Sequence, residues 1–440
     1  MNQENSLTTS RREFLRASGA VTAGLVAAPF VVTGRAAELS PGDTIKVGLI
    51  GCGGRGTGAA KQALNADKNV QLVAMADAFE SQLNNALATL KKDREVGEKV
   101  KVEGAKSFVG LDAYQKLIDS GVDLVVLATP PGFRPQHLQA AVAAGKHIFC
   151  EKPMATDAPG VRSVLQSVEE AKKKNLALVA GFCWRYDLAR REFFKRLHDG
   201  VIGDVRALYH TYLSTPVKPM PSADSRKPGM TDVEWQMRNW YNFTWLSGDG
   251  LTEQGVHSVD KMAWAMKDVP PLKCTAVGGR TRPNNEGNIY DHIEVNYEFA
   301  NGARGFVVHR QIPGCYSETR DYLIGSKGNG NIGGRRSAVE FTDMAGEIQW
   351  RSGAADRDMY QVEHDELFAS IRNGKPINDG VRMATSTLMA LMGRMAAYSG
   401  QEVTWEQAMN SKEQLVPEKL TWDMSLPIAP MAMPGKTKFI

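Results

Sequence analysis

The chain has 440 residues, of which 42% are hydrophobic and 23% are charged, with a formal net charge of +4. This balance is that of a globular protein of two or three domains, and it excludes a mainly disordered chain, a fibrous repeat and a polytopic membrane protein. The positive charge is small and dispersed, so nucleic acid is not expected as a partner. The five cysteines form no CxxC or Cys/His cluster, and we expect buried thiols rather than disulfides or metal ligands.

The first forty residues are predicted to be an export signal. Arg11 and Arg12 precede a weakly apolar stretch at 17–33 and small residues at 34–37. Paired arginines, a modest apolar region and a small-residue cleavage zone are typical of a twin-arginine signal, which carries folded proteins. The apolar run is shorter than the roughly 20 residues that cross a bilayer, so no stable membrane span is expected. We therefore expect a periplasmic protein.

A glycine-rich turn follows the first predicted strand, Ile45–Ile50. The turn reads Gly51-Cys52-Gly53-Gly54-Arg55-Gly56, it opens a helix-compatible stretch, and Asp77 ends the next apolar run 21 residues after Gly56. In this context the glycines predict a dinucleotide site. Gly51 permits the tight turn, Gly53 lets the backbone approach a pyrophosphate, and Gly56 lets helix and strand pack closely. The phosphates would then meet a helix N-terminus. An ordinary glycine turn is the alternative.

Asp77 bears on the choice of cofactor. Its carboxylate would accept hydrogen bonds from the adenosine ribose and would repel a 2′-phosphate. The residues that follow are Ala78 and Phe79 rather than an arginine. We therefore expect NAD in preference to NADP.

Strand and helix continue to alternate through the first half of the chain. Near-continuous apolar runs at 123–128, 147–150 and 176–180 are typical of parallel strands covered on both faces. The first of these runs ends in Thr129-Pro130 and the second in Glu151-Lys152-Pro153, at the sheet edge where such folds bind ligands. We predict an α/β domain over 41–182, a doubly wound parallel sheet of about six strands.

The pattern changes in the second half. Asn301-Gly302 is a hairpin turn signal between two extended runs. We predict an α+β domain over 183–412, with a mostly antiparallel open sheet and helices on one face, and a tail over 413–440. The extended segments are 205–214, 274–279, 289–300, 303–311, 321–324, 338–341 and 347–350, and the helical ones include 361–372 and 384–399.

These motifs resemble a known family. The glycine turn, Thr129-Pro130, the run at 144–147 and above all Glu151-Lys152-Pro153 are similar to the Gfo/Idh/MocA family of sugar and cyclitol oxidoreductases. The resemblance runs from about 45 to near 408 and implies a Rossmann domain followed by an open sheet that is a common oligomer interface. We therefore expect a homodimer or homotetramer through the C-terminal sheet. The predicted cofactor contacts are Gly51, Cys52, Gly53, Arg55, Gly56, Asp77, Thr129, Pro130, His137, Glu151 and Lys152.

Three residues are predicted to be catalytic. Lys152 would take the proton of the substrate hydroxyl, with its pKa lowered by burial beside another cation. His257 would act as second acid or base, and Glu253, where the family has Asp, would orient His257 or hold a neighbouring hydroxyl. Glu253 and His257 are four residues apart in a helix-like stretch, so half of a metal site and a plain surface pair are alternatives. We expect no metal, because no third ligand stands at suitable spacing.

Aromatic and amide side chains concentrate at 238–245, which suits a sugar with one apolar face and many hydroxyls. Packing at a domain interface is the alternative for these residues. The predicted substrate contacts are Lys152, Arg185, Tyr186, Tyr241, Glu253 and His257.

An exported enzyme would need a tightly held cofactor that is recycled in the site. We therefore expect an NAD(P)-dependent oxidoreductase of a sugar or cyclitol hydroxyl. One alternative is an NAD-dependent glycoside hydrolase acting through a transient keto-sugar; several such hydrolases depart from the lysine that this chain keeps as Lys152. The other is a non-catalytic sugar-binding protein, which would have no need for the glycine turn, Asp77, Lys152 and His257 together.

Overall fold

The computed structural model describes residues 42–282, 286–334, 337–353 and 357–438. The predicted export signal at 1–40, with Arg11 and Arg12, lies outside the described residues. Within the described ranges, no helix combines the length and the apolar character that a bilayer crossing requires.

The first domain is a six-stranded parallel sheet with the strand order β3-β2-β1-β4-β5-β6. This confirms the predicted doubly wound fold. Its direction of winding reverses between β1 and β4, the point at which such sheets bind ligands. The strands are β1 (Ile45–Ile50), β2 (Val70–Asp77), β3 (Ser107–Val109), β4 (Leu124–Leu127), β5 (His147–Cys150) and β6 (Leu178–Ala180).

Helices cover both faces of this sheet, so every residue of β4 and β5 is buried. This double coverage is the physical reason for their unbroken apolar runs. The helices are α2 (Gly54–Ala66), α3 (Glu80–Lys92), α4 (Ala113–Ile118), α5 (Arg134–Ala143) and α6 (Ala158–Lys173).

The second sheet has nine strands in the order β14-β13-β12-β11-β7-β10-β9-β8-β15. Neighbouring strands are antiparallel except for β7 and β10, which confirms the prediction of a mostly antiparallel sheet. The strands are β7 (Val205–Ser214), β8 (Lys273–Gly279), β9 (His292–Glu298), β10 (Arg304–Gln311), β11 (Glu318–Gly325), β12 (Gly328–Ile332), β13 (Val339–Asp343), β14 (Ile348–Ser352) and β15 (Val403–Thr404).

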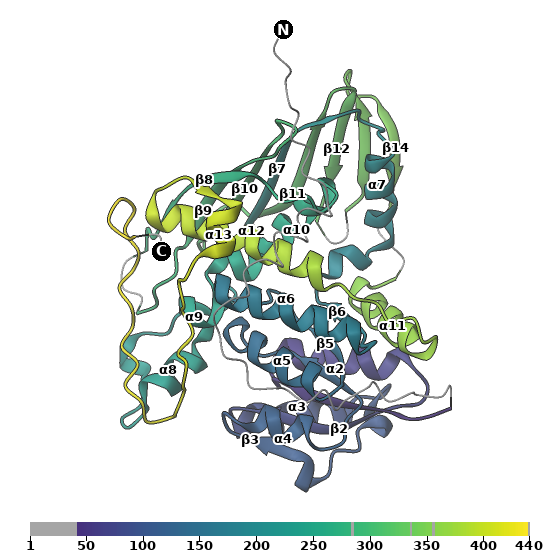
Figure 1. Ribbon diagram of the computed structural model, residues 1–440, viewed down its shortest axis with the longest axis vertical. Helices are drawn as coiled ribbons and strands as arrows, with labels where there is room; N and C mark the ends of the chain where they lie inside the picture. The colour runs from purple at the N-terminus through teal and green to yellow at the C-terminus, as the bar shows by residue number, and fades with distance from the viewer. Residues whose placement is uncertain (1–41, 283–285, 335–336, 354–356, 439–440) are drawn as a thin grey trace. The chain divides into compact units, whose positions relative to one another are not determined.

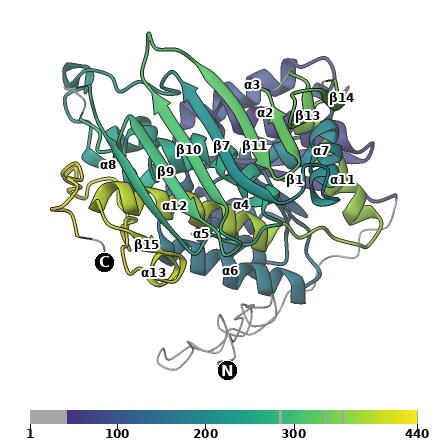
Figure 2. The ribbon, with the colours of Figure 1, turned by 90° about the horizontal axis from the view of Figure 1, so that it is seen from above.

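Helices α10 (Val256–Ala265) and α12 (Gly380–Ser399) pack on strands of the second sheet, and Figure 2 shows the strands in front of α12. Nearly all of α12 is buried, because it also packs on α6 of the first domain. The remaining helices are α7 (Leu188–His198), α8 (Asp232–Arg238), α9 (Thr244–Ser247), α11 (Met359–Arg372) and α13 (Trp405–Asn410).

The last described stretch, 411–438, runs along the molecule as an extended segment (yellow in Figure 1). Its backbone is fixed to both domains: the Leu415 N–H donates to Asp157 at 2.9 Å and the Leu426 N–H donates to Asp232 at 3.1 Å. Its Trp422 ring lies 5.6 Å from the Phe79 ring. The segment predicted as a tail is therefore part of the packed structure.

The cysteines follow the prediction with one exception. Cys52, Cys150, Cys183 and Cys274 are buried free thiols, whereas Cys315 is exposed. The expectation of burial was wrong for Cys315, which follows Gly314 in the turn after β10 rather than lying in an apolar run.

Candidate active site

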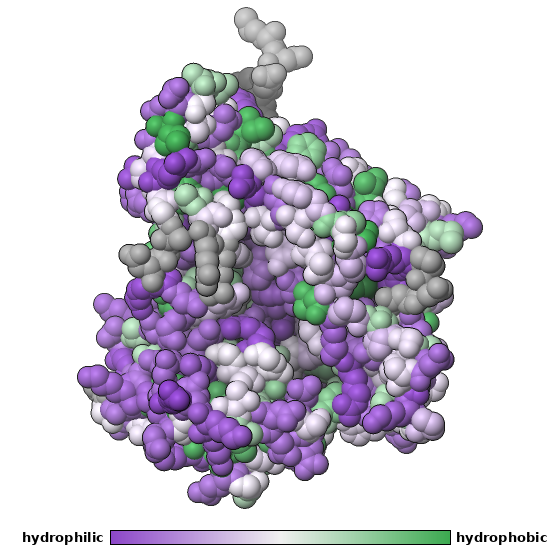
Figure 3. Space-filling view, turned by 180° about the vertical axis from the view of Figure 1, so that it is seen from behind, coloured by the Kyte–Doolittle hydropathy of each residue, from purple (hydrophilic) through white to green (hydrophobic). Residues whose placement is uncertain are grey.

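A cavity of about 580 Å³ lies where the carboxyl ends of β1, β2, β4 and β5 meet the second domain. Its walls come from both domains, and the space-filling view from behind is hollowed at mid-height (Figure 3). The glycine turn, Asp77, Thr129, Lys152, Glu253 and His257 all line it. The structure thus brings most of the predicted site residues to one cavity.

The glycine turn forms one end of the cavity. Gly51 has a φ of +95°, and a Cβ there would stand 2.6 Å from the backbone carbon of Ala128. A Cβ on Gly56 would collide with the Gly51 carbonyl, whereas Gly53 has open space where a Cβ would be. Gly53 caps α2 without a side-chain hydrogen bond, so the first N–H groups of α2 have no side-chain partner. The turn therefore fits the phosphates of a dinucleotide.

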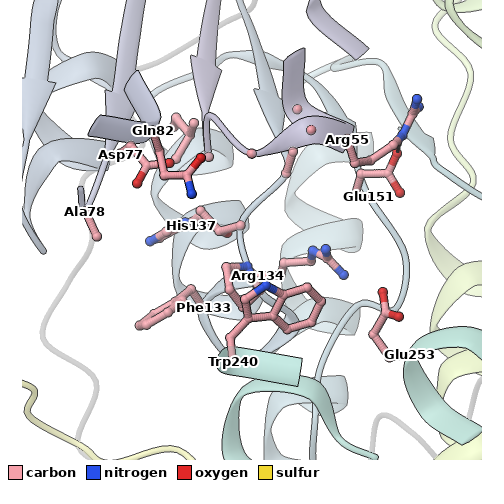
Figure 4. Close-up of a pocket in the computed structure, with 18 of the residues that line it drawn as sticks. Arg55, Asp77, Ala78, Gln82, Phe133, Arg134, His137, Glu151, Trp240 and Glu253 are labelled. Atoms are coloured by element: carbon pink, nitrogen blue, oxygen red, sulfur yellow. Dashed lines mark hydrogen bonds and ion pairs between the residues drawn. The ribbon is translucent and has the colours of Figure 1, made fainter. Parts of the chain in front are cut away.

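Asp77 ends β2 beside this turn. Its carboxylate accepts hydrogen bonds from the backbone N–H groups of Cys52 at 2.7 Å and Phe79 at 2.8 Å. Burial raises the pKa of Asp77 despite these bonds. The Cys52 side chain points into the core and does not line the cavity, so its predicted contact is confined to its backbone. Figure 4 shows Asp77, Ala78 and Gln82 together at this end.

Thr129, Pro130 and His137 line the middle of the cavity. The Thr129 hydroxyl and His137 Nδ1 are 3.2 Å apart, and the His137 ring stacks on Tyr114 at 4.1 Å. Burial, with a contribution from nearby Arg134, lowers the pKa of His137 to about 3. His137 is therefore a neutral imidazole at physiological pH.

Arg55 and Glu151 form an ion pair in the cavity wall (Figure 4). Arg55 also pairs with Glu363 at 3.1 Å, so its predicted role as a cofactor contact is limited by two carboxylates that already hold its guanidinium. Burial opposes ionisation of Glu151, but the charges of Arg55, Lys152 and Arg134 outweigh it and lower the pKa of Glu151. Burial raises the pKa of Glu363 well above its usual range, although the charge of Arg55 opposes this rise.

Lys152, Glu253 and His257 meet at the other end of the cavity. Lys152 Nζ donates to Glu253 Oε1 at 3.0 Å and to the Glu253 backbone carbonyl, and both side chains are less than a tenth exposed. Burial and the positive charge of Lys152 lower the pKa of His257 well below its usual range. His257 Nδ1 is buried and has no hydrogen-bond partner among the described residues. The end of the cavity therefore presents an ammonium group and a neutral imidazole.

One of the two predicted roles of Glu253, the orientation of His257, does not agree with the structure, while a contact with a substrate hydroxyl stays a prediction. Glu253 does not hold His257; one of its oxygens pairs with Lys152 and the other accepts from Gln254 Nε2 at 2.6 Å. The reason is local: residues Leu251–Gly255 form a π-helical turn, which precedes α10. A π-helical turn has more residues than an α-helical turn, so a spacing of four does not place Glu253 directly over His257.

Three predicted substrate contacts do not line the cavity. Arg185 is buried in ion pairs with Asp260 at 2.9 Å and Asp268 at 2.5 Å. The Tyr186 hydroxyl donates to Asp379 at 2.8 Å, and the Tyr241 hydroxyl donates to Gln311 at 2.8 Å. These side chains stabilise the packing of the chain, which for Tyr241 was the alternative given for 238–245, and we correct the prediction of a substrate contact for all three.

Other residues line the cavity without having been predicted. Arg134 begins α5, directly after the short 3-10 turn Pro131–Phe133, and Trp240 is the neighbour of the predicted Tyr241. From the stretch at 238–245, Arg238 and Trp240 line the cavity, whereas Tyr241 does not. The second domain also contributes Tyr212, Lys218, Arg238 and Gln254. No cluster of three metal-ligating side chains occurs in the described part of the chain.

Comparisons with known proteins agree with this geometry. Residues 45–182 match the family model described as an oxidoreductase family with an NAD-binding Rossmann fold. The chain is 27% identical over 349 residues to the inositol 2-dehydrogenase of Rhizobium meliloti, covering 77% of this chain and 93% of the relative. It is 27% identical to an α-N-acetylgalactosaminidase of Shewanella oneidensis over only 37% of this chain and 38% of that one. The crystal structure of aldose-aldose oxidoreductase from Caulobacter crescentus shares the fold, with a TM-score of 0.63 at 20% identity over 82% of this chain and 99% of that one.

Proposed function

Because the chain belongs to the Gfo/Idh/MocA family of oxidoreductases, we propose that it oxidises or reduces a secondary hydroxyl of a sugar or cyclitol, with a nicotinamide dinucleotide in the cavity. One observation carries this proposal. The Lys152–Glu253 pair and the neutral His257 lie in the same cavity as the glycine turn and Asp77. The inositol 2-dehydrogenase relative supports the substrate class.

The three residues divide the proton chemistry between them. The Lys152 ammonium group donates a hydrogen bond to Glu253 and is held in place by it. A second N–H of the same group donates to the substrate oxygen and stabilises negative charge there. His257, being neutral, accepts the hydroxyl proton as the carbonyl forms, and returns it in the reverse direction. When bound, the dinucleotide accepts the hydride that leaves carbon. This assignment moves the base from Lys152 to His257, since Lys152 is held in an ion pair.

NAD rather than NADP is part of the proposal, since the Asp77 carboxylate stands at the end of β2. We also propose that the protein is exported by the predicted twin-arginine signal and keeps its cofactor between turnovers. Fractionation of cells that express the full chain tests export. Mass spectrometry of the purified protein tests whether a cofactor is retained and whether it is NAD.

The experiment for the activity uses the purified chain and its Lys152→Ala variant. We expect bound cofactor in both proteins and a loss of at least about a hundredfold in turnover in the variant, the usual scale for removing one donor that stabilises developing negative charge. Turnover near that of the wild type in Lys152→Ala would reject the role of Lys152. A protein that purifies without a nicotinamide dinucleotide, and binds none when it is added, would favour the non-catalytic sugar-binding alternative.

A second candidate function is NAD-dependent glycoside hydrolysis through a transient keto-sugar. The partial match to an α-N-acetylgalactosaminidase favours it, but it covers little more than a third of the chain. Incubation with aryl glycosides and with free sugars, while cofactor absorbance and aglycone release are followed, separates the two. Aglycone release without net reduction of the cofactor would support the hydrolase.

The outer face of the second sheet bears on assembly. Tyr209, Val277 and Ile324 are exposed on its strands. We propose that this face joins copies of the chain into a homodimer or homotetramer. Light scattering after gel filtration should give an even multiple of the chain mass, and a Val277→Asp variant should shift it toward the monomer.

A further inference from the structure

Arg134 is a buried cation with no ion-pair partner among the described residues. It begins α5, lines the cavity, and is only 4% exposed. Its Nη1 donates to the Pro153 carbonyl at 2.5 Å, and its Nε has no hydrogen-bond partner among the described residues. Buried charges in proteins are ordinarily paired, because an unpaired one has lost its water without compensation. No described residue supplies an anionic partner for the Arg134 guanidinium, so we expect a bound ligand to supply it.

The acidic side chains of the cavity are already engaged. Glu151 is paired with Arg55, Glu253 with Lys152, and Asp77 accepts two backbone N–H groups at the far end. The reacting end of the cavity is therefore left with an excess of positive charge. Figure 4 shows Arg134 projecting into the part of the cavity that also contains Trp240 and Glu253.

The anchoring of Arg134 fixes where its ligand would be. The bond from Nη1 to the Pro153 carbonyl holds the guanidinium against the segment that follows Lys152, in the cavity that Lys152 also lines. A guanidinium offers five N–H donors in a planar fork that matches a carboxylate with two parallel hydrogen bonds. Lys218 adds a further positive charge to the lining of the same cavity, whereas Arg238, which also lines it, is paired with Glu234 at 2.8 Å.

We propose that Arg134 binds a carboxylate of the substrate, so that the enzyme acts on an acidic sugar such as a hexuronate or aldonate in preference to the neutral sugar. This inference rests on the proposed function and names the substrate class of the same site. A phosphate of the cofactor offers the same anionic chemistry, and the experiment has to separate these two sources.

The experiment compares Arg134→Gln with the wild type on matched probes. The acids are D-glucuronate, D-galacturonate and D-gluconate, and the neutral counterparts are D-glucose, D-galactose and D-glucitol. We expect the wild type to favour an acid over its counterpart by at least tenfold in kcat/KM, since a charge-assisted bidentate contact in a buried site has about this value or more. In Arg134→Gln this preference should disappear, while neutral turnover and the Kd for NADH change less than threefold.

Two results would overturn the proposal. One is a wild type that favours the neutral sugars. The other is a loss in Arg134→Gln that is equal for acids and neutral sugars and is matched by weaker NADH binding, which would assign Arg134 to the cofactor. Arg206→Gln, on an exposed arginine of β7, is the matched control and should leave both values unchanged.

A binding measurement keeps the test independent of turnover and of the variant's folding. Calorimetric titration of the wild-type protein, with NADH present, should show tighter binding of at least one acid than of its neutral counterpart, and this difference should shrink as salt rises. Equal or weaker binding of all three acids would refute the carboxylate site even if the protein proves to be an active dehydrogenase. Acid binding without turnover would instead support the carboxylate site while contradicting the proposed function.

Discussion

The pairing of Lys152 with Glu253 makes a quantitative prediction. Both side chains are less than a tenth exposed, and Nζ and Oε1 are 3.0 Å apart. Replacing Lys152 with Met leaves the Glu253 carboxylate buried beside no cation of its own, and removing one partner of a buried pair typically costs about 3–5 kcal/mol. Glu253→Gln leaves the Lys152 ammonium group buried without its carboxylate partner. Each single variant should therefore lose free energy of unfolding on this scale in urea titrations.

The double variant Lys152→Met/Glu253→Gln removes both charges. Its loss in free energy of unfolding should be smaller than the sum of the two single losses by about 2–3 kcal/mol. Its turnover should stay as low as that of Lys152→Met, because stability is recovered without the group that contacts the substrate oxygen. Lys116→Met breaks an exposed pair with Asp112 and is the control, with an expected cost of about 0–1 kcal/mol. Additivity of the two single variants within about 0.5 kcal/mol would refute the pairing.

Three further predictions follow from the geometry. Gly53→Val should weaken NADH binding at least about tenfold with little change in stability, since its side chain would occupy the open space at the phosphates; an unchanged Kd by fluorescence titration would contradict the placement. Burial lowers the pKa of His309, in β10, to about 3 in the folded protein. As pH falls below about 6.5, the unfolded chain binds a proton at this residue and the folded protein does not, so the free energy of unfolding decreases. His309→Phe should therefore lose about 1 kcal/mol less than the wild type between pH 6 and pH 5 in urea titrations, and an identical slope would contradict this. Trp422→Ala should weaken NADH retention in equilibrium dialysis through Phe79, which lines the cavity, and equal retention would show that the contact has no bearing on the cofactor.

Local patterns were sufficient for five of the six strands of the first domain, all but β3. Strands buried on both faces read as apolar runs, and the glycine turn has steric requirements that leave a direct mark on the sequence. β3 has three residues and β15 has two, too few for any periodicity to identify them. β12 reads Gly-Asn-Gly-Asn-Ile and is a strand because β11 and β13 pair with it on either side, which is a property of the tertiary structure.

The site was predictable as a set of residues but not as a set of contacts. Lys152 and His257 were identified, yet the π-helical turn that directs Glu253 toward Lys152 has no sequence signature that we used. Arg185 was expected in the cavity because it follows the last parallel strand, and only the tertiary structure shows that Asp260 and Asp268 hold it elsewhere. The partner of a long charged side chain depends on residues distant in the chain, so local spacing does not determine it.

The extended C-terminal segment has a consequence for folding during synthesis. Leu415, Trp422 and Leu426 belong to an apolar cluster that also contains Phe133 and Trp240, and these two residues form part of a wall of the cavity. A ribosome makes residues 415–426 well after the parallel sheet, which therefore has time to form first. That wall is complete only after residues 415–426 have been made and have packed against the earlier part of the chain.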